Sequence, residues 1–199
     1  MNETPLRTAT IERITGETRI QLNLTLDGSG KARVQTGIGF LDHMLTALAK
    51  HSRMDISLTC VGDLEVDTHH TTEDCALVLG QGIREALGNF GGIERFGSAY
   101  APLDEALVRV VVDLCGRPYS VVEVPFRREQ IGALPTEDIT HFFQSLAIAM
   151  GAALHVDLLR GENDHHKSEA AFKALALALR HAIRTTGNSD IPSTKGVLG

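Results

Sequence analysis

The sequence has few of the residues that build disulfide frameworks, thiolate zinc sites or membrane spans. Its three cysteines, Cys60, Cys75 and Cys115, are odd in number and form no C-x-x-C pair, which argues against both a disulfide scaffold and a thiolate zinc site. The longest uncharged apolar stretch, from Leu146 to Leu154, is far too short to cross a bilayer. The N-terminal residues contain no apolar core of a signal peptide. We therefore expect a protein of the reducing cytoplasm that has no membrane partner.

Positive charge is also scarce. The chain has 19 Lys and Arg residues against 25 Asp and Glu residues, so its formal net charge is −6, and no long Lys/Arg run reverses this locally. A nucleic-acid partner of the usual basic kind is therefore not expected. An anionic small molecule would need a local cationic pocket. With 199 residues, 43% of them hydrophobic and 22% charged, the chain has the composition of an ordinary soluble globular protein.

One polar motif occurs twice. His69-His70-Thr71-Thr72-Glu73 returns in the second half as His165-His166-Lys167-Ser168-Glu169, and a further histidine, His43 or His141, precedes each copy at nearly the same distance. Packing gives no reason to repeat such a polar signature. The repeat therefore indicates a duplicated half-domain that carries paired sets of metal ligands.

Hydrophobic periodicity predicts a similar order of elements in both halves. In the first half we expect a strand over 7–26 with a polar break near 15–17, a strand near 32–36, a helix carrying His43, a strand over 55–61 and a helix from the His69 motif to about residue 88. In the second half we expect strands over 106–114 and 119–124, a helix from His141 to about Met150, a strand over 154–159 and a helix opened by the His165 motif. Each half reads β-β-α-β-α, which predicts an α+β fold, a two-layer sandwich with pseudo-twofold symmetry.

The same pattern predicts the domain organisation. We expect a single domain over 1–199 made of two homologous halves, about 7–90 and 91–190, that join in the region of Gly91-Gly92 and Pro102. A C-terminal tail, 191–199, follows them.

Helix geometry sorts the ligands of the repeat. Positions i and i+4 share one face of a helix, so His69 with Glu73, and His165 with Glu169, can approach one ion together. Adjacent residues diverge by about 100° around the helix axis, so His69 and His70 are expected to serve different ions. Imidazole and carboxylate ligands suit Mn, Fe, Zn or Ni, and composition does not choose among them. Three histidines outside the repeat are expected to face solvent or cap helices: His51, His155 and His181.

Other short motifs accompany the repeat along nearly the whole chain. They are Arg13-x-Thr15-x-Glu17-Thr18, Gly37-Ile38-Gly39-Phe40-Leu41-Asp42-His43-Met44, Asp74 after the first His-His motif, Arg95-Phe96-Gly97, Asp113-Leu114-x-Gly116-Arg117-Pro118 and Pro192-Ser193-Thr194-Lys195-Gly196. In this order and spacing the chain closely resembles the imidazoleglycerol-phosphate dehydratases, lyases of histidine biosynthesis. The ligand positions show no departure from the family pattern.

The resemblance implies an activity and a site. The reaction would convert imidazole glycerol phosphate to imidazole acetol phosphate and water. Two Mn(II) ions per active site would be held by His43, His69, His70, Glu73, His141, His165, His166 and Glu169. Arg95, Arg117, Ser193 and Lys195 would grip the substrate phosphate, and Glu17 would lie near the reacting carbons. The family also implies a homo-oligomer of 24 subunits with its sites at subunit interfaces.

Glu17 and Glu169 are the candidates for proton transfer. Glu17 is favoured because it lies outside the repeated ligand sets and is free to titrate, whereas Glu169 is a ligand, a base or both. The motifs show no counterpart in the other half for Glu17 or for the cations Arg95, Arg117 and Lys195. We therefore expect one asymmetric substrate pocket on a symmetric scaffold. The guanidinium fork and the lysine point charge together suit a phosphate monoester.

Two neighbouring residues of these motifs have plainer interpretations. Thr18 is expected to be an ordinary strand residue. Asp42 is interpreted as an N-terminal helix charge, with the orientation of an imidazole as the alternative.

Three rival functions fit parts of the pattern. A di-iron carboxylate protein also repeats Glu and His, but on a four-helix bundle and in the order Glu-x-x-His. A purely structural metal site would leave Glu17 and the phosphate-binding cations without a role. A dinuclear metallohydrolase is disfavoured because the motifs contain few aspartates that could bridge metals.

Overall fold

Two similar halves make up the structure. A computed structural model describes residues 6–196 and residue 198, so residues 197 and 199 of the expected tail lie outside the described residues. The first half contains β1 (Thr8–Ile14), β2 (Thr18–Thr25), β3 (Ala32–Gln35), α1 (Gly39–Ser52), β4 (Asp55–Gly62) and α2 (His69–Leu87). The second contains β5 (Phe96–Leu103), β6 (Ala106–Asp113), β7 (Tyr119–Glu123), the short pair β8 (Gln130–Ile131) and β9 (Leu134–Pro135), α3 (Thr136–Met150), β10 (Ala153–Arg160) and α4 (Asp164–Ala182).

The two main sheets have the same topology. Their strand orders are β1-β2-β4-β3 and β5-β6-β10-β7. In each sheet the first three strands pair antiparallel and the last pair, β4 with β3 or β10 with β7, is parallel. The predicted α+β class and the duplicated half-domain are thereby confirmed. A four-helix bundle, the scaffold of the di-iron rival, is excluded by the two four-stranded sheets.

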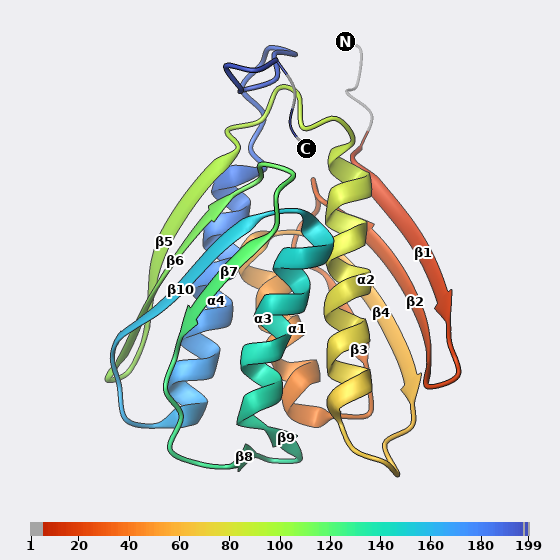
Figure 1. The fold of residues 1–199 in the computed structure, drawn as a ribbon, viewed down its shortest axis with the longest axis vertical. Helices are drawn as coiled ribbons and strands as arrows, with labels where there is room; N and C mark the ends of the chain where they lie inside the picture. The colour runs from red at the N-terminus through yellow and green to blue at the C-terminus, as the bar shows by residue number, and fades with distance from the viewer. Residues whose placement is uncertain (1–5, 197, 199) are drawn as a thin grey trace.

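The helices lie between the sheets, so each half is a two-layer unit and the halves meet helix to helix (Figure 1). Helix α2 packs on α3, and α1 packs on α4, across the boundary between the halves. Buried hydrophobic residues of both halves form one continuous cluster. The approach is close at Gly80 of α2, where a β-carbon would lie 2.8 Å from the carbonyl oxygen of Leu146.

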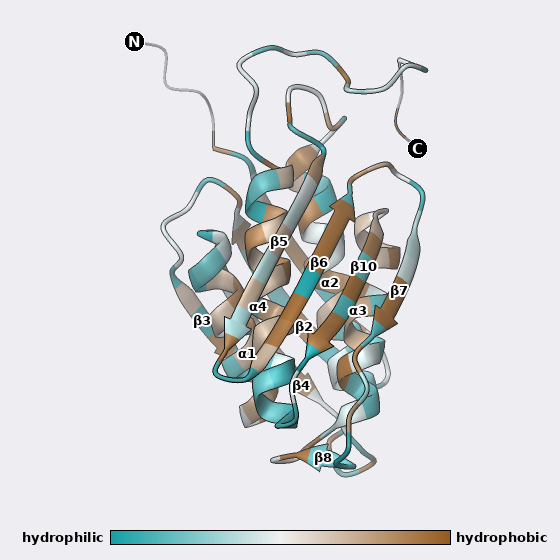
Figure 2. Ribbon diagram, turned by 90° about the vertical axis from the view of Figure 1, so that its left-hand side faces the viewer, coloured by the Kyte–Doolittle hydropathy of each residue, from teal (hydrophilic) through white to brown (hydrophobic). Residues whose placement is uncertain are grey.

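Alternating side chains explain the central strands. Val108, Val110 and Val112 of β6 are fully buried, and the residues between them are less so, as expected for a strand with one face on a helical layer. Figure 2 shows the hydrophobic residues concentrated on β6 and β10, the two central strands of this sheet. Among the described residues, no helix is long and apolar enough to span a membrane.

The order of elements differs from the prediction by one long strand in each half, and the second half also contains the short pair β8 and β9, which was not predicted. The expected strand over 7–26 is a hairpin, because Thr15, Gly16 and Glu17 form a turn between β1 and β2. In the second half, β5 was not predicted. Apart from the β8–β9 pair, each half therefore reads β-β-β-α-β-α.

Strand β5 escaped prediction because its buried face is made of small residues. Gly97, Ala99 and Ala101 face inward, and a β-carbon on Gly97 would lie 2.0 Å from the carbonyl oxygen of Ala178 on α4. Close packing of the helix thus removes the large apolar residues by which a strand is recognised. Pro102 was predicted to lie in the join between the halves, but it lies within β5. The connection between the halves therefore runs over 88–95.

Helix α3 begins earlier than predicted, at Thr136 instead of His141. Thr136 hydrogen-bonds the carbonyl oxygens of Arg128 and Glu129, and Glu137 and Asp138 supply the negative charge that favours a helix start. The first turn is mostly polar, so hydrophobic periodicity does not mark it.

The close approach of α4 to β5 predicts a stability effect. We expect Gly97→Ala to destabilise the protein by about 3 kcal/mol, because the new methyl group overlaps a backbone oxygen that cannot move freely. Thermal midpoints at equal protein concentration measure the effect. Gly39→Ala is the control, since nothing lies within 4 Å of its β-carbon. Equal midpoints for the two variants would contradict the close packing.

Candidate metal centres and phosphate pocket

The first candidate metal centre joins α1 to α4. His43 Nε2 lies 3.2 Å from Glu169 Oε2, and His165 Nε2 lies 3.3 Å from the same oxygen. The three residues offer ligand atoms within 4.8 Å of one another. We call this set triad A.

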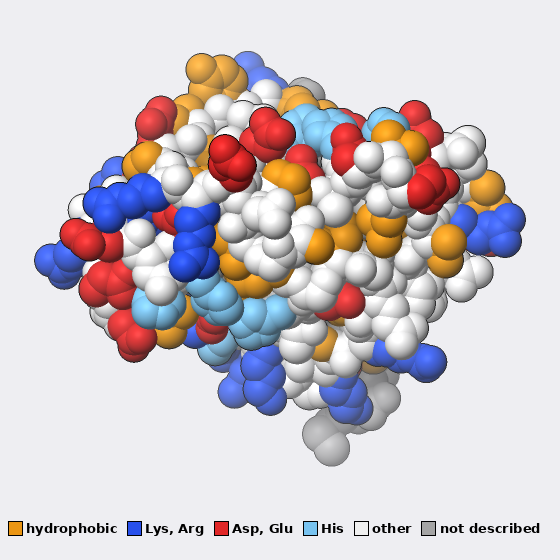
Figure 3. All heavy atoms as spheres, turned by 90° about the horizontal axis from the view of Figure 1, so that it is seen from below, with side chains coloured by type: hydrophobic (Ala, Val, Ile, Leu, Met, Phe, Trp, Pro, Cys, Tyr) orange, Lys and Arg blue, Asp and Glu red, His pale blue; other side chains and the backbone are white. Residues whose placement is uncertain are grey.

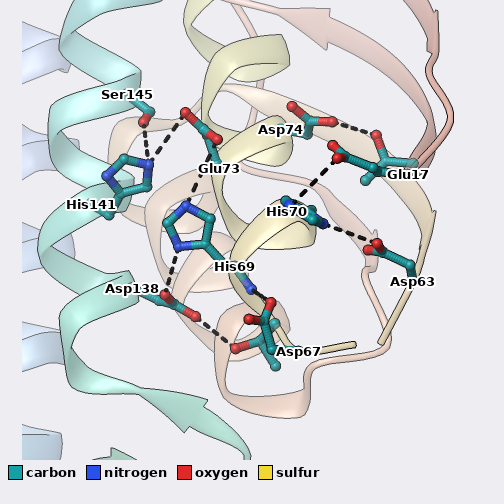
Figure 4. Close-up of polar contacts among 12 residues, drawn as sticks. Glu17, Asp63, Asp67, His69, His70, Glu73, Asp74, Asp138, His141 and Ser145 are labelled. Atoms are coloured by element: carbon teal, nitrogen blue, oxygen red, sulfur yellow. Dashed lines mark hydrogen bonds and ion pairs between the residues drawn. The ribbon is translucent and has the colours of Figure 1, made fainter. Parts of the chain in front are cut away.

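The second candidate centre, triad B, joins α3 to α2. His141 Nε2 lies 3.3 Å from Glu73 Oε1, and His69 Nε2 lies 4.0 Å from Glu73 Oε2. The rings of His69 and His141 are stacked with centroids 4.6 Å apart. Figure 4 shows the three side chains turned toward one another between the two helices.

Each triad is assembled from both halves of the chain. Triad A takes its single histidine from the first half and its His-x-x-x-Glu pair from the second, and triad B does the reverse. The i, i+4 spacing places each pair on one face of the first turn of a helix. Neither half therefore contains a complete triad of its own, a relation that the sequence alone did not reveal.

Side-chain hydrogen bonds to the first-turn amides fix the start of both ligand helices. Asp67 Oδ1 accepts the backbone N–H of His69 at 2.8 Å, and Asn163 Oδ1 accepts that of His165 at 2.9 Å. Such side-chain acceptors satisfy the free amides of a first helical turn. The start of α4 is also held by the buried ion pair between Asp164 and Lys167, whose N···O distance is 2.8 Å.

The two triads differ in what surrounds them. In triad B, Asp138 Oδ1 lies 3.4 Å from His69 Nδ1, and Asp138 also accepts the Thr68 hydroxyl at 2.6 Å. A carboxylate behind a histidine fixes its ring and tautomer. In triad A, the ring of Phe40 packs edge-on against His165 at 5.0 Å. The two contacting residues hold equivalent positions. Asp138 lies three residues before His141 on α3, and Phe40 lies three residues before His43 on α1.

Glu169 is more strongly held than Glu73. Lys173 Nζ lies 2.6 Å from Glu169 Oε1, and the side chain of Glu169 is 14% exposed against 35% for Glu73. Burial opposes the ionisation of Glu169, but Lys173 and His43 outweigh it and lower the pKa of this carboxyl. Glu169 is therefore an anion whose two oxygens are both engaged.

The second histidine of each motif lies outside the triads. His70 Nδ1 is 2.9 Å from Asp63 Oδ2, and His166 Nδ1 is 2.7 Å from Glu105 Oε2. These hydrogen bonds raise the pKa of both histidines, and that of Glu105 is lowered to about 2, chiefly by His166. The rings of His69 and His70 are nearly perpendicular. That adjacent histidines serve different ions stays a prediction.

Glu17 lies beside His70, in the turn between β1 and β2. Its Oε1 is 3.5 Å from His70 Nε2 (Figure 4). The second half has a counterpart, because Asp104 in the turn between β5 and β6 places Oδ2 3.7 Å from His166 Nε2. Glu17 therefore does have a matching partner, contrary to the prediction from the motifs. The match was hidden because β5, and hence this turn, was missed.

The predicted phosphate-binding residues also come together. Arg95, Arg117, Ser193 and Lys195 line a pocket of about 590 Å³, together with Phe96, Pro192 and Thr194. Arg95 is rigidly held, since its Nε and Nη2 donate to Asp113 at 2.7 and 3.0 Å and its Nη1 donates to the Pro192 carbonyl at 2.7 Å. The hydrogen bonds with Asp113 raise the pKa of Arg95. The hydrogen bond from Arg95 to Pro192 holds the C-terminal segment that carries Ser193 and Lys195.

The phosphate pocket and the triads lie at opposite ends of the molecule. The triads, Glu17 and the two β-turns gather where the helices begin, at the lower end in Figure 1, and Figure 3 shows this end with its histidines. The backbone N–H of Arg95, by contrast, donates to the carbonyl oxygen of Ala182 at the far end of α4. At about 1.5 Å per residue, α4 separates the two ends by about 28 Å. One copy of the chain therefore does not bring its predicted metal ligands and phosphate grip together.

The donor atoms of each triad fit a divalent transition metal. Two imidazole nitrogens and one carboxylate oxygen form a mixed set that suits Mn, Fe or Zn. Three protein ligands leave further positions of a six-coordinate ion open for other ligands or for substrate.

Several residues at these sites were not singled out from the sequence. Asp63, Asp104, Glu105 and Lys173 contact the predicted residues but lie outside the quoted motifs. Asp113, which binds Arg95, was quoted in a motif but given no role. The position of Lys173, four residues after Glu169 on a predicted helix, was the one available signal. The others depend on strand and turn positions that were not predicted.

The expectations for Asp42, Thr18 and the three histidines outside the repeat are met only in part. Asp42 Oδ1 accepts the backbone N–H and hydroxyl of Thr36 at 2.8 and 2.7 Å at the start of α1, which fits a helix-start role. Thr18 is a strand residue, but its hydroxyl is also bonded to Asp74. His155 and His181 are exposed, while His51 is partly buried and its pKa is lowered by burial.

Comparison with known proteins points to one family. The family model "Imidazoleglycerol-phosphate dehydratase" matches residues 36–179. Curated relatives of that name include those of Eremothecium gossypii, 54% identical with all of both chains covered, and Saccharomyces cerevisiae, 52% identical with 96% of this chain and 97% of the relative covered. A relative from Phytophthora nicotianae is 58% identical over 97% of this chain, which spans 43% of that protein's length.

Solved structures agree as well. Imidazoleglycerol-phosphate dehydratase from Staphylococcus aureus has a TM-score of 0.81 at 36% identity, with 90% of this chain and 99% of that chain covered. The enzyme from Pyrococcus furiosus, solved in complex with (S)-C348, has a TM-score of 0.83 at 38% identity, with 94% and 100% covered. The chain belongs to the imidazoleglycerol-phosphate dehydratase family, the carbon–oxygen lyases of histidine biosynthesis.

Proposed function

We propose that this chain dehydrates imidazole glycerol phosphate to imidazole acetol phosphate with the help of two Mn(II) ions per active site. The observation that carries the proposal is the pair of triads, A and B, in which two histidines and a glutamate converge from both halves of the chain. Family membership supplies the substrate and the reaction, and the mixed nitrogen and oxygen ligands support the metal.

The chain acts as a homo-oligomer, a 24-mer, whose active sites form between copies. Two observations support this proposal. His70 and His166 point away from the triads of their own chain, so they are available to complete triads on neighbouring copies. The phosphate pocket lies a helix length from the triads, so a substrate bound at a triad needs the pocket of another copy.

The residues divide the chemistry among them. Arg117, Ser193 and Lys195 hold the phosphate, and Arg95 holds the tail and adds charge to the same pocket. When bound, the metals would polarise the substrate's imidazole ring and so ease loss of the neighbouring hydroxyl. Glu17 takes the carbon-bound proton, since its carboxylate is exposed and adjoins a proposed ligand, His70. Glu169 serves as a ligand, because both of its oxygens are engaged.

A cytoplasmic location is part of the same proposal. Cys60, Cys75 and Cys115 are free thiols and are buried. Unpaired cysteines are typical of a reducing compartment.

A metal-exchange assay tests the proposed function. Purified protein should convert imidazole glycerol phosphate, lose this turnover when a chelator removes its divalent ions, and regain it when Mn(II) is returned. Metal content measured on the same samples tells loss of metal from loss of folded protein. Full turnover by verified metal-free protein would exclude the metal mechanism. Bound metal without turnover would instead favour the rival in which metal only stabilises the assembly.

A further inference from the structure

A buried carboxylate joins the turn that carries Glu17 to the helix that carries triad B. Asp74 follows Glu73 on α2 and points to the other side, toward the β1–β2 hairpin (Figure 4). Its Oδ2 accepts the Thr18 hydroxyl at 2.5 Å and forms an ion pair with Arg13. Asp74 and Thr18 are 5% and 3% exposed. The contact is therefore part of the packed interior.

The backbone of Glu17 is held on both sides. Its N–H donates to the Thr15 hydroxyl at 3.1 Å, and its carbonyl accepts the N–H of Asp63 at 3.1 Å. The Thr15 hydroxyl also accepts the N–H of Thr18 at 3.0 Å. The side chain of Glu17 remains 54% exposed. The turn is fixed, and only the carboxylate is left free.

The second half lacks this connection. Ala170 follows Glu169 where Asp74 follows Glu73, so α4 has no carboxylate at this position to hold the turn that carries Asp104. Asp74 thus distinguishes the Glu17 turn from its counterpart. The overall fold does not require the contact, because the second half forms the same elements without it.

We propose that Asp74, with Arg13 and Thr18, is a positioning group that holds Glu17 in register with the metal-bearing helix. The polar partners of the Asp74 side chain are Thr18 and Arg13, and neither belongs to triad B, so Asp74 acts on the reaction through Glu17. This inference rests on the proposed role of Glu17 in proton transfer. Misplacement of a reacting group by about 1 Å can cost about 100-fold in rate, so the contact is expected to control kcat.

Removal of the Thr18 hydroxyl tests the positioning role with the smallest change to the protein. Thr18→Val keeps the shape of the side chain and removes the hydrogen bond, and we expect it to lower kcat about 10- to 100-fold, with KM and bound Mn(II) within about twofold of the wild type. Thr18→Ser restores the hydroxyl and should recover most of kcat. Ser52→Ala, which removes a buried hydroxyl at the far end of α1, is the control and should leave kcat unchanged.

Combination with Glu17→Gln separates positioning from general stability. If Asp74 acts through Glu17, Asp74→Asn and Thr18→Val lower kcat in the wild-type chain but have little further effect in the Glu17→Gln chain. Equal losses in both backgrounds would overturn the inference. So would a fall in Mn(II) content that matches the fall in kcat, or failure of Thr18→Ser to recover activity.

Turnover of the wild-type chain distinguishes failure of the proposed function from failure of the inference about Asp74. An Mn(II)-loaded wild type without dehydratase turnover overturns the proposed function and this inference together. A wild type with normal turnover whose Thr18→Val variant equals it overturns the inference alone. If Asp74→Asn does not fold, the Thr18 variants alone give the answer.

Discussion

Replacement of Glu17 by Gln is expected to lower kcat by about 10²- to 10⁴-fold, the usual contribution of a positioned acid or base. The amide keeps the size of the side chain but neither takes nor gives a proton at neutral pH. Glu17 lies outside both triads, so bound metal should be unchanged. Steady-state turnover and metal analysis on the same preparation measure both quantities.

Glu12→Gln is the matched control for this substitution. Glu12 lies on β1 of the same hairpin and is exposed, so its replacement removes the same charge and should leave kcat near the wild-type value. Near-normal turnover of a fully metal-loaded Glu17→Gln variant would exclude Glu17 as an essential acid or base.

Mixed assemblies of two nearly inactive variants are expected to recover about a quarter of wild-type turnover, if each active site combines one copy's Glu17 with another copy's phosphate pocket and subunits mix at random. The first variant is Glu17→Gln. The second carries Arg117→Ala and Lys195→Ala, which together remove two charge-assisted contacts to phosphate and should lower kcat/KM by about 10²- to 10⁴-fold. Each variant supplies what the other lacks.

The recovery follows from the separation of the two ends of the chain, about 28 Å along α4. Dissociation and joint reassembly, with native mass spectrometry to verify the exchange of subunits, prepare the sample. Unmixed variants reassembled in the same way are the controls. Exchanged assemblies without recovered turnover would show that both groups act from a single copy.

The features that could be predicted from the sequence are those that depend on residue spacing within one helix or strand. Helical spacing around Leu41 and Met44, and the i, i+4 relation of His69 to Glu73, predicted buried faces and shared ligand faces that the structure contains. These relations depend on backbone geometry within a single element. They hold whatever the element packs against.

The features that the sequence did not predict depend on packing between elements. Strand β5 has Gly97 and Ala99 on its buried face because α4 lies close to it, so its pattern is not hydrophobic. The pairing of His43 with Glu169 depends on how α1 meets α4. The positions of Asp63 and Asp104 depend on strand register and turns. Local periodicity carries no information on such contacts.

The reciprocal make-up of the triads has an evolutionary consequence. His43 of the first half meets the ligand pair of the second, and His141 of the second meets that of the first. This exchange is the relation between the two subunits of an isologous homodimer, in which residue i contacts j and j contacts i. A gene encoding one half would have specified all the ligands of a triad, yet its product would have bound metal only after dimerising. Fusion of two such genes would make that dimer permanent. It would also let the two triads diverge, with Asp138 beside His69 in one and Phe40 beside His165 in the other.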